Sequence, residues 1–167
     1  MVNIVQFNEQ LLFGGAITMP VPSTYMDASQ IRQIPDNQEV YLDTESDNSL
    51  IVELLELDPV DILQSVENHF NQLAEDNDAI NPIIVTKSKL TNHDDICLLI
   101  GQQSVSKFNE NTVHEVNVLC GLVRLSTVAS DILISMNVVG DINDGIISGF
   151  TVALEKFKVL DFGLFVN

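Results

Sequence analysis

The segment that follows Pro35 carries the residues best suited to binding chemistry. Asp36 and Glu39 flank two amide side chains, those of Asn37 and Gln38. Because the residue before a proline avoids helical backbone, we expect an exposed turn here that leads into a strand at Gln38. Two carboxylates and two amides displayed together can form charge-assisted hydrogen bonds with an Arg or Lys of another molecule. The pattern therefore predicts a binding surface.

Catalysis and metal binding lack a matching set of residues. The chain has three histidines, at His69, His93 and His114. They form no zinc-like cluster, and the sequence contains neither a phosphate-binding loop nor a nucleophile elbow. Two segments alternate acidic residues as calcium loops do, but Leu54 and Val152 stand where calcium needs a bidentate carboxylate. We therefore expect no enzyme, no metal site and no cofactor.

The charge of the chain is strongly acidic and unevenly spread. It has 24 Asp and Glu against 7 Lys and Arg, which gives a formal net charge of −17. Residues 33 to 86 contain no Lys or Arg but 13 Asp and Glu. This balance argues against nucleic-acid binding and against attachment to anionic membranes, since both depend on basic side chains. The acidic run is either a solvated face or a docking patch for a basic partner.

The length and composition fit a single domain over residues 1–167. Of the 167 residues, 46% are hydrophobic and 19% are charged, which is too apolar for intrinsic disorder. No apolar stretch is long enough to span a membrane, and the first ten residues lack the pattern of a secretory signal. Cys97 and Cys120 lie within apolar runs, so we expect reduced, buried thiols rather than a disulfide. We also expect a monomer.

The elements around the acidic segment are predicted to be short strands and one helical turn. A first strand is expected over Leu11–Thr18, ended by the prolines that follow it. A helical turn is expected over Asp27–Gln33, in which Asp27 or Ser29 accepts first-turn amide hydrogens. Two further strands are expected, over Gln38–Asp43 and Ser49–Leu57.

A long helix is expected to begin at Asp58 and Pro59. Asp58 suits the N-cap, Pro59 suits the first helical position, and Asp61 adds favourable charge to the first turn. Apolar residues then recur at spacings of three and four, which predicts one buried stripe. The stripe consists of Ile62, Leu63, Val66, Phe70 and Leu73.

After Pro82 the pattern is typical of consecutive antiparallel strands, followed by a last helix over Ile142–Val159. The expected strands are Ile83–Leu90, Ile96–Phe108, Glu115–Leu125 and Asp131–Val139. In the last of them the alternating apolar residues from Ile132 to Val138 share one face. A mostly antiparallel sheet flanked by helices buries these faces, so we expect an α+β fold arranged as an α/β/α sandwich.

Seven pieces of the sequence, in order, resemble the Mog-type family of Ran-binding nuclear import proteins. The pieces are Leu12–Thr18, Asp27–Arg32, Ile34–Val40, Ser49–Glu56, Gly101–Gln103, Arg124–Leu125 with Asp131–Ser135, and Leu160–Phe165. The resemblance implies a PsbP-like sandwich with an antiparallel sheet between helices. It also implies a protein of the nucleus and cytoplasm that binds the small GTPase Ran, promotes release of its guanine nucleotide and supports nuclear import.

In that family an acidic surface with an Asp-x-x-Glu motif carries Ran binding. The motif falls on Asp36 and Glu39, with Asn37 and Gln38 between them, and a preceding family aspartate falls on Asp27. Arg32 also matches a family position, where it either faces the partner or pairs with a local carboxylate. The alternative function is a Ran-binding adaptor that holds Ran without accelerating nucleotide release.

Overall fold

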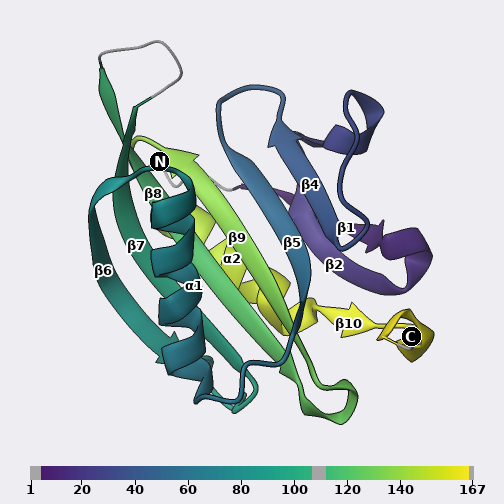
Figure 1. Ribbon diagram of the computed structural model, residues 1–167. Helices are drawn as coiled ribbons and strands as arrows, with labels where there is room; N and C mark the ends of the chain where they lie inside the picture. Colours follow the sequence, from purple (N-terminus) through teal and green to yellow (C-terminus); the bar gives the residue numbers. More distant parts are fainter. Residues whose placement is uncertain (1–4, 107–111, 166–167) are drawn as a thin grey trace.

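In the residues that the computed structural model describes, 5–106 and 112–165, seven strands form one antiparallel sheet (Figure 1). Across the sheet the order is β3 (Tyr25–Asp27), β4 (Gln38–Asp43), β5 (Ser49–Glu56), β9 (Ser130–Val139), β8 (Val113–Leu125), β7 (Ile96–Ser106) and β6 (Ile80–Lys89). The strands predicted after Pro82 and the two predicted over Gln38–Asp43 and Ser49–Leu57 are therefore confirmed, with some ends shifted by a few residues.

A second, smaller sheet lies against one face of the large one. It has the order β1 (Phe7–Leu12), β2 (Ile17–Pro22) and β10 (Lys158–Val159). Helix α2 (Asp144–Lys156) covers the same face, and helix α1 (Ile62–Asp76) covers the opposite face over β6, β7 and β8 (Figure 1). The α+β fold class is confirmed, while the small sheet was not expected from the sequence.

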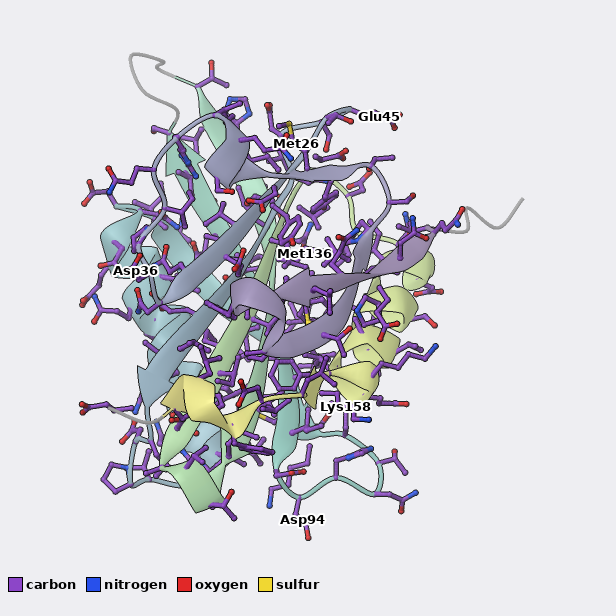
Figure 2. The ribbon with its side chains drawn as sticks, turned by 90° about the vertical axis from the view of Figure 1, so that its right-hand side faces the viewer. Met26, Asp36, Glu45, Asp94, Met136 and Lys158 are labelled. Atoms are coloured by element: carbon purple, nitrogen blue, oxygen red, sulfur yellow. The ribbon has the colours of Figure 1, made fainter. Side chains whose placement is uncertain are left out.

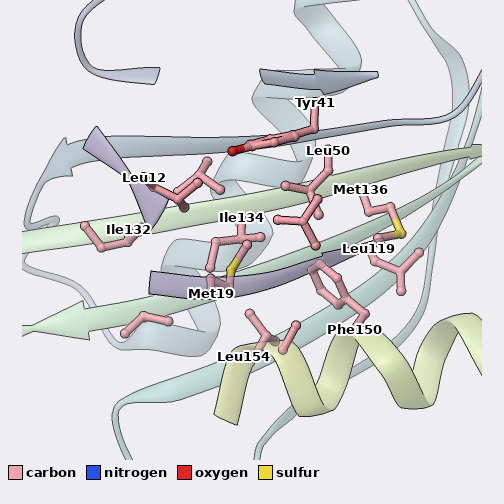
Figure 3. Close-up of a cluster of buried hydrophobic side chains, with 14 of the residues drawn as sticks. Leu12, Met19, Tyr41, Leu50, Leu119, Ile132, Ile134, Met136, Phe150 and Leu154 are labelled. Atoms are coloured by element: carbon pink, nitrogen blue, oxygen red, sulfur yellow. The ribbon is translucent and has the colours of Figure 1, made fainter. Parts of the chain in front are cut away.

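Two hydrophobic cores lie on the two faces of the large sheet. The core on the side of α2 contains Leu12, Met19, Leu50, Ile134, Phe150 and Leu154 among others (Figure 3). The core under α1 contains the predicted helix stripe, with Ile62, Val66 and Phe70 buried and Leu63 and Leu73 half-buried. Cys97 and Cys120 lie in this second core as free thiols, as expected.

The described residues also contain four turns of 3-10 helix, of which the first three each connect two strands and the fourth follows β10. They are η1 (Phe13–Gly15), η2 (Ala28–Gln30), η3 (Ser126–Val128) and η4 (Phe162–Phe165). In the described ranges neither α-helix has the length and apolarity needed to cross a bilayer.

The strand expected over Leu11–Thr18 is wrong, because η1 divides it into the two arms of the β1–β2 hairpin. Pro20 and Pro22 lie inside β2 rather than beyond it. Along β2 the backbone N–H and C=O groups of successive residues point alternately to β1 and to β10. The carbonyl of Ala16, just before β2, points to the β10 side, where Leu160 N–H donates to it. Pro20 and Pro22 share this direction beyond the end of β10, so their missing N–H groups break no ladder bond.

The predicted start of α1 at Asp58 is also wrong. The helix begins at Ile62, and its N-cap is Asp61, whose carboxylate accepts a hydrogen bond from Leu63 N–H at 3.1 Å. The backbone of Asp58 is used elsewhere, since its N–H donates to the Asp131 carboxylate and its carbonyl accepts from Arg124. These bonds hold the irregular segment before the helix, which bends at Pro59 and Val60.

The last helix is shorter than expected. α2 ends at Lys156, and the next residues pair with β2 as β10. Asn143 caps the start of α2 by accepting a hydrogen bond from Ile146 N–H at 2.9 Å. The predicted end of the strand Ile96–Phe108, at Phe108, lies outside the described residues.

Candidate partner-binding site

A shallow pocket of about 360 Å³ opens where β3, β4, the β1–β2 turn and η4 meet. Three carboxylates line it, those of Asp27, Asp36 and Glu39, together with the side chain of Gln38. Four of the six residues predicted from the sequence therefore lie around one cavity. Its remaining lining residues are Phe13, Ser29, Ile34, Pro35 and Leu164.

Asp27 is held by the local backbone at the end of β3. Its carboxylate accepts a hydrogen bond from Ser29 N–H at 2.9 Å and so caps η2, which confirms the predicted cap at Asp27. Asp27 also pairs with Tyr41 of β4 across the sheet. The residue is half-buried, with its charge facing the pocket.

Asp36 lies on the exposed turn expected after Pro35 (Figure 2). Gln38 N–H donates to the Pro35 carbonyl at 3.0 Å, which closes the turn immediately before β4. Within residues 5–106 and 112–165 the Asp36 side chain makes neither a hydrogen bond nor an ion pair. Its carboxylate is therefore available to another molecule.

Glu39 is partly buried and bound to the β1–β2 turn. Its Oε1 accepts a hydrogen bond from Phe13 N–H at 2.8 Å. Burial raises the pKa of Glu39, the Phe13 N–H opposes this shift, and the charge of Asp27 adds to it. Phe13 has φ +52° and the next two residues, Gly14 and Gly15, have φ +67° and +94°. The carboxylate thus stabilises a left-handed turn.

The negative charge of the pocket is not neutralised by the described part of the chain. The ion pairs among the described residues join Lys87 to Glu67 and Arg124 to Asp131, and none of these four residues lines the pocket. Burial, followed by the charges of Glu39 and Asp27, raises the pKa of the neighbouring Tyr41 to about 12. The site therefore presents a negative field to a partner.

The other two predicted residues are placed differently. Arg32 is exposed, does not line the pocket, and makes no ion pair with any described carboxylate, so the local pairing considered for it is absent there. The Asn37 amide donates to the Leu54 carbonyl at 3.3 Å, which ties the turn to β5. Gln38 donates to Glu53 at 2.6 Å and is similarly tied.

Sequence reasoning missed the apolar side of the pocket. Phe13 and Leu164 line it from opposite ends of the chain, 151 positions apart, and neither was predicted as a site residue. Both belong to pieces that resemble the Mog-type family, Leu12–Thr18 and Leu160–Phe165, so a signal was present without an assigned role.

A larger groove, of about 670 Å³, lies between β1 and α2 and contains none of the predicted residues. Phe7, Pro20 and Val152 form much of its lining. We place the candidate site at the smaller pocket because its three carboxylates converge without a basic partner in the described residues. No group of three or more His, Cys, Asp or Glu in those residues is arranged to hold a metal ion.

Comparison with known proteins identifies a protein family to which the sequence is similar. The family model described as "Ran-interacting Mog1 protein" matches residues 10–139. The chain is 39% identical to the Ran guanine nucleotide release factor of Danio rerio, with 75% of each chain covered. It is 36% identical to the nuclear import protein mog1 of Schizosaccharomyces pombe, with 75% of this chain and 74% of that one covered.

The fold is similar to the crystal structure of the Saccharomyces cerevisiae Ran-binding protein Mog1p. The TM-score is 0.85, the identity is 24%, and the match covers 97% of this chain and 100% of that one. At this identity the likeness concerns the fold.

Proposed function

Because the chain belongs to the Mog1 family, we propose that it binds the small GTPase Ran and promotes release of Ran's guanine nucleotide in nuclear protein import. The observation that carries this proposal is the convergence of Asp27, Asp36 and Glu39 on one pocket without a basic partner in the described chain. The function places the protein in the nucleus and the cytoplasm, between which import operates.

The pocket suits a Lys or Arg side chain of Ran. The apolar residues Phe13 and Leu164 offer contact to an alkyl stem, and Asp36 offers an unoccupied carboxylate to its charged head. Glu39 and Asp27 each have one oxygen engaged by a backbone N–H, which leaves further acceptor positions on both carboxylates. Asp36 is therefore the principal contact, and the other two set its surroundings.

Such a protein acts by binding rather than by covalent catalysis. It stabilises the nucleotide-poor form of Ran relative to the loaded form and so shifts the population towards release. By linkage, the factor by which it weakens nucleotide binding equals the factor by which nucleotide weakens its own binding. GTPases hold phosphate through Lys, backbone amides and magnesium, so the carboxylates act either by holding a basic side chain away or by disfavouring the magnesium ion.

We further propose that residues 1–167 act as one monomeric domain. The core on the α2 side gathers buried residues from Leu12 to Leu154 and partly buried ones from Phe7 to Phe165. Sedimentation of the purified protein as a single unit of 18.5 kDa tests the monomer.

Release of labelled nucleotide from Ran tests the function. Ran is loaded separately with GTP and GDP, and the dissociation rate is measured with and without the protein. The expected result is an increased rate, with the increase smaller by about tenfold or more for Asp36→Ala. Binding to Ran with an unchanged dissociation rate would identify an adaptor instead, and the absence of binding would refute both functions.

A further inference from the structure

The segment Leu160–Phe165 folds back against the turn between β1 and β2 (Figure 1). Leu160 N–H and Asp161 N–H both donate to the Ala16 carbonyl, at 2.7 Å and 3.1 Å. The Asp161 carboxylate in turn accepts a hydrogen bond from Gly163 N–H at 2.8 Å, which shapes η4. Figure 2 shows this C-terminal turn (yellow) beside the β1–β2 turn (purple). The position of the segment is therefore fixed by the same turn that binds Glu39.

Two large apolar side chains of this segment face solvent. Leu160 is 51% exposed and Phe162 is 50% exposed. The Phe162 ring lies 6.4 Å from the Phe165 ring at an interplanar angle of 47°, and Phe165 packs against the core. Phe162 is thus held in place by a neighbour while half of its surface stays in water. Exposed apolar groups that are clustered and held in this way are typical of interaction surfaces.

The C-terminal segment that carries these two side chains also reaches the acidic pocket. Leu164, in the same turn of 3-10 helix as Phe162, lines the pocket together with Phe13, Asp36 and Glu39. Protein interfaces combine a desolvated aromatic or aliphatic centre with charged groups around it. The carboxylates and the C-terminal apolar residues together supply both parts.

We propose that Leu160 and Phe162 form the apolar part of the Ran-binding surface, next to the acidic pocket. This inference rests on the proposed function. The complementary surface of Ran carries an apolar patch beside a Lys or Arg, so that the cation enters the pocket while the patch covers Phe162. A second copy of this chain fits less well, because each copy has a formal charge of −17 and would bring its own carboxylates against this pocket.

The test compares Phe162→Ser and Leu160→Ser with the wild type for Ran affinity at low and at high salt. Each variant is expected to weaken binding about tenfold at both salt concentrations, because an apolar contact is not screened by ions. Asp36→Asn, in contrast, is expected to reduce the salt dependence itself. Val85→Ser is the matched control, since Val85 is 56% exposed on β6, at the opposite edge of the sheet from β3.

The outcomes separate this inference from the proposed function. Wild-type protein that fails to bind Ran refutes the function, and this inference with it. Wild-type protein that binds Ran, with both serine variants equal to it, overturns this inference alone. A self-associated wild type that Phe162→Ser dissociates without loss of Ran affinity assigns the patch to a second copy and also overturns it. Thermal unfolding accompanies each assay, and unfolding of both serine variants contradicts their placement on the surface.

Discussion

The buried carboxylate of Asp131 and the three carboxylates of the acidic pocket differ in whether a cation among the described residues is bound to them. Asp131 is fully buried, and Arg124 binds both of its oxygens, with Nε 2.9 Å from Oδ1 and Nη2 3.0 Å from Oδ2. Two further N–H groups of Arg124 donate to the carbonyls of Asp58 and Val60, at 2.8 Å and 2.6 Å. The carboxylates of Asp27, Asp36 and Glu39 have no such cation within residues 5–106 and 112–165.

Asp131 carries a charge that is neutralised within the fold, whereas the charges of the acidic pocket have no cation among the described residues. A buried carboxylate needs a partner of opposite charge and hydrogen bonds, and Arg124 supplies both for Asp131 while fixing the segment before α1. Carboxylates gathered without a cation repel one another, which costs stability that a basic partner can recover. In the proposed function a basic partner supplies the positive charge that the described residues do not place at the acidic pocket.

The largest effect is expected from breaking the buried pair. Arg124→Met leaves the Asp131 carboxylate buried without its cation and should lower the free energy of unfolding by about 3–5 kcal/mol. Urea denaturation measures this loss. Asp36→Asn is the contrasting variant and should stay within about 0.5 kcal/mol of the wild type, because Asp36 is exposed.

The double variant Arg124→Met/Asp131→Leu sharpens the test. It removes both charges and should recover part of the stability lost in Arg124→Met. Equal losses in the single and double variants would show that the bonds from Arg124 to the two carbonyls, rather than its pairing with Asp131, hold the segment.

The second effect concerns Ran affinity. Asp36→Ala should weaken binding and nucleotide release by about tenfold or more, which corresponds to about 1.4 kcal/mol, while leaving the fold intact. Asp27→Ala should have a milder effect, since Asp27 also caps η2. Glu75 is exposed on α1, so Glu75→Ala removes one acidic charge outside the pocket and serves as the control. A loss of the same size in the control would attribute binding to general acidity.

A third, smaller effect separates the two roles of Glu39. Glu39→Ala removes the acceptor for Phe13 N–H and should lower the free energy of unfolding by about 0.5–1.5 kcal/mol. Glu39→Gln retains an acceptor oxygen and should remain close to the wild type in denaturant unfolding. Both variants lose the charge, so both should bind Ran less tightly. Unchanged affinity in Glu39→Gln would mean that Glu39 only supports the turn.

Sequence patterns predicted six of the seven strands of the large sheet, all but β3, and the charged residues, because both depend on local order. Alternation identified β9, and the turn after Pro35 followed from the conformational limits of proline. Long-range contacts were not predictable in this way. Asp58 resembles a good N-cap locally, yet Asp131 and Arg124, more than 60 residues later, engage its backbone.

The same limit applies to the candidate site. Asp36 and Glu39 were predicted from four neighbouring residues, and Gly14 and Gly15 are a local pattern for a turn. Nothing local, however, shows that Phe13 N–H in that turn binds Glu39, 26 residues later. Leu164 reaches the pocket only because the chain after α2 pairs with β2. Predicting such a contact requires knowledge of the fold, whereas the charge of the site can be predicted from the sequence alone.

The smallest effect is expected in the pH dependence of stability. Burial raises the pKa of Glu39 above its ordinary value of 4.5, against the opposing hydrogen bond from Phe13 N–H and with the support of the Asp27 charge. A carboxyl group with a raised pKa binds its proton more tightly in the folded than in the unfolded chain. Its contribution to the free energy of unfolding therefore decreases as the pH rises from 4.5 through the raised pKa.

Because Glu39→Gln does not titrate, the stability of the wild type relative to this variant should fall over that interval and be constant above it. Urea denaturation of both proteins from about pH 4 to pH 7 measures this difference. A relative stability that rises with pH would show that the Phe13 hydrogen bond outweighs burial, so that the folded chain stabilises the charged form of Glu39.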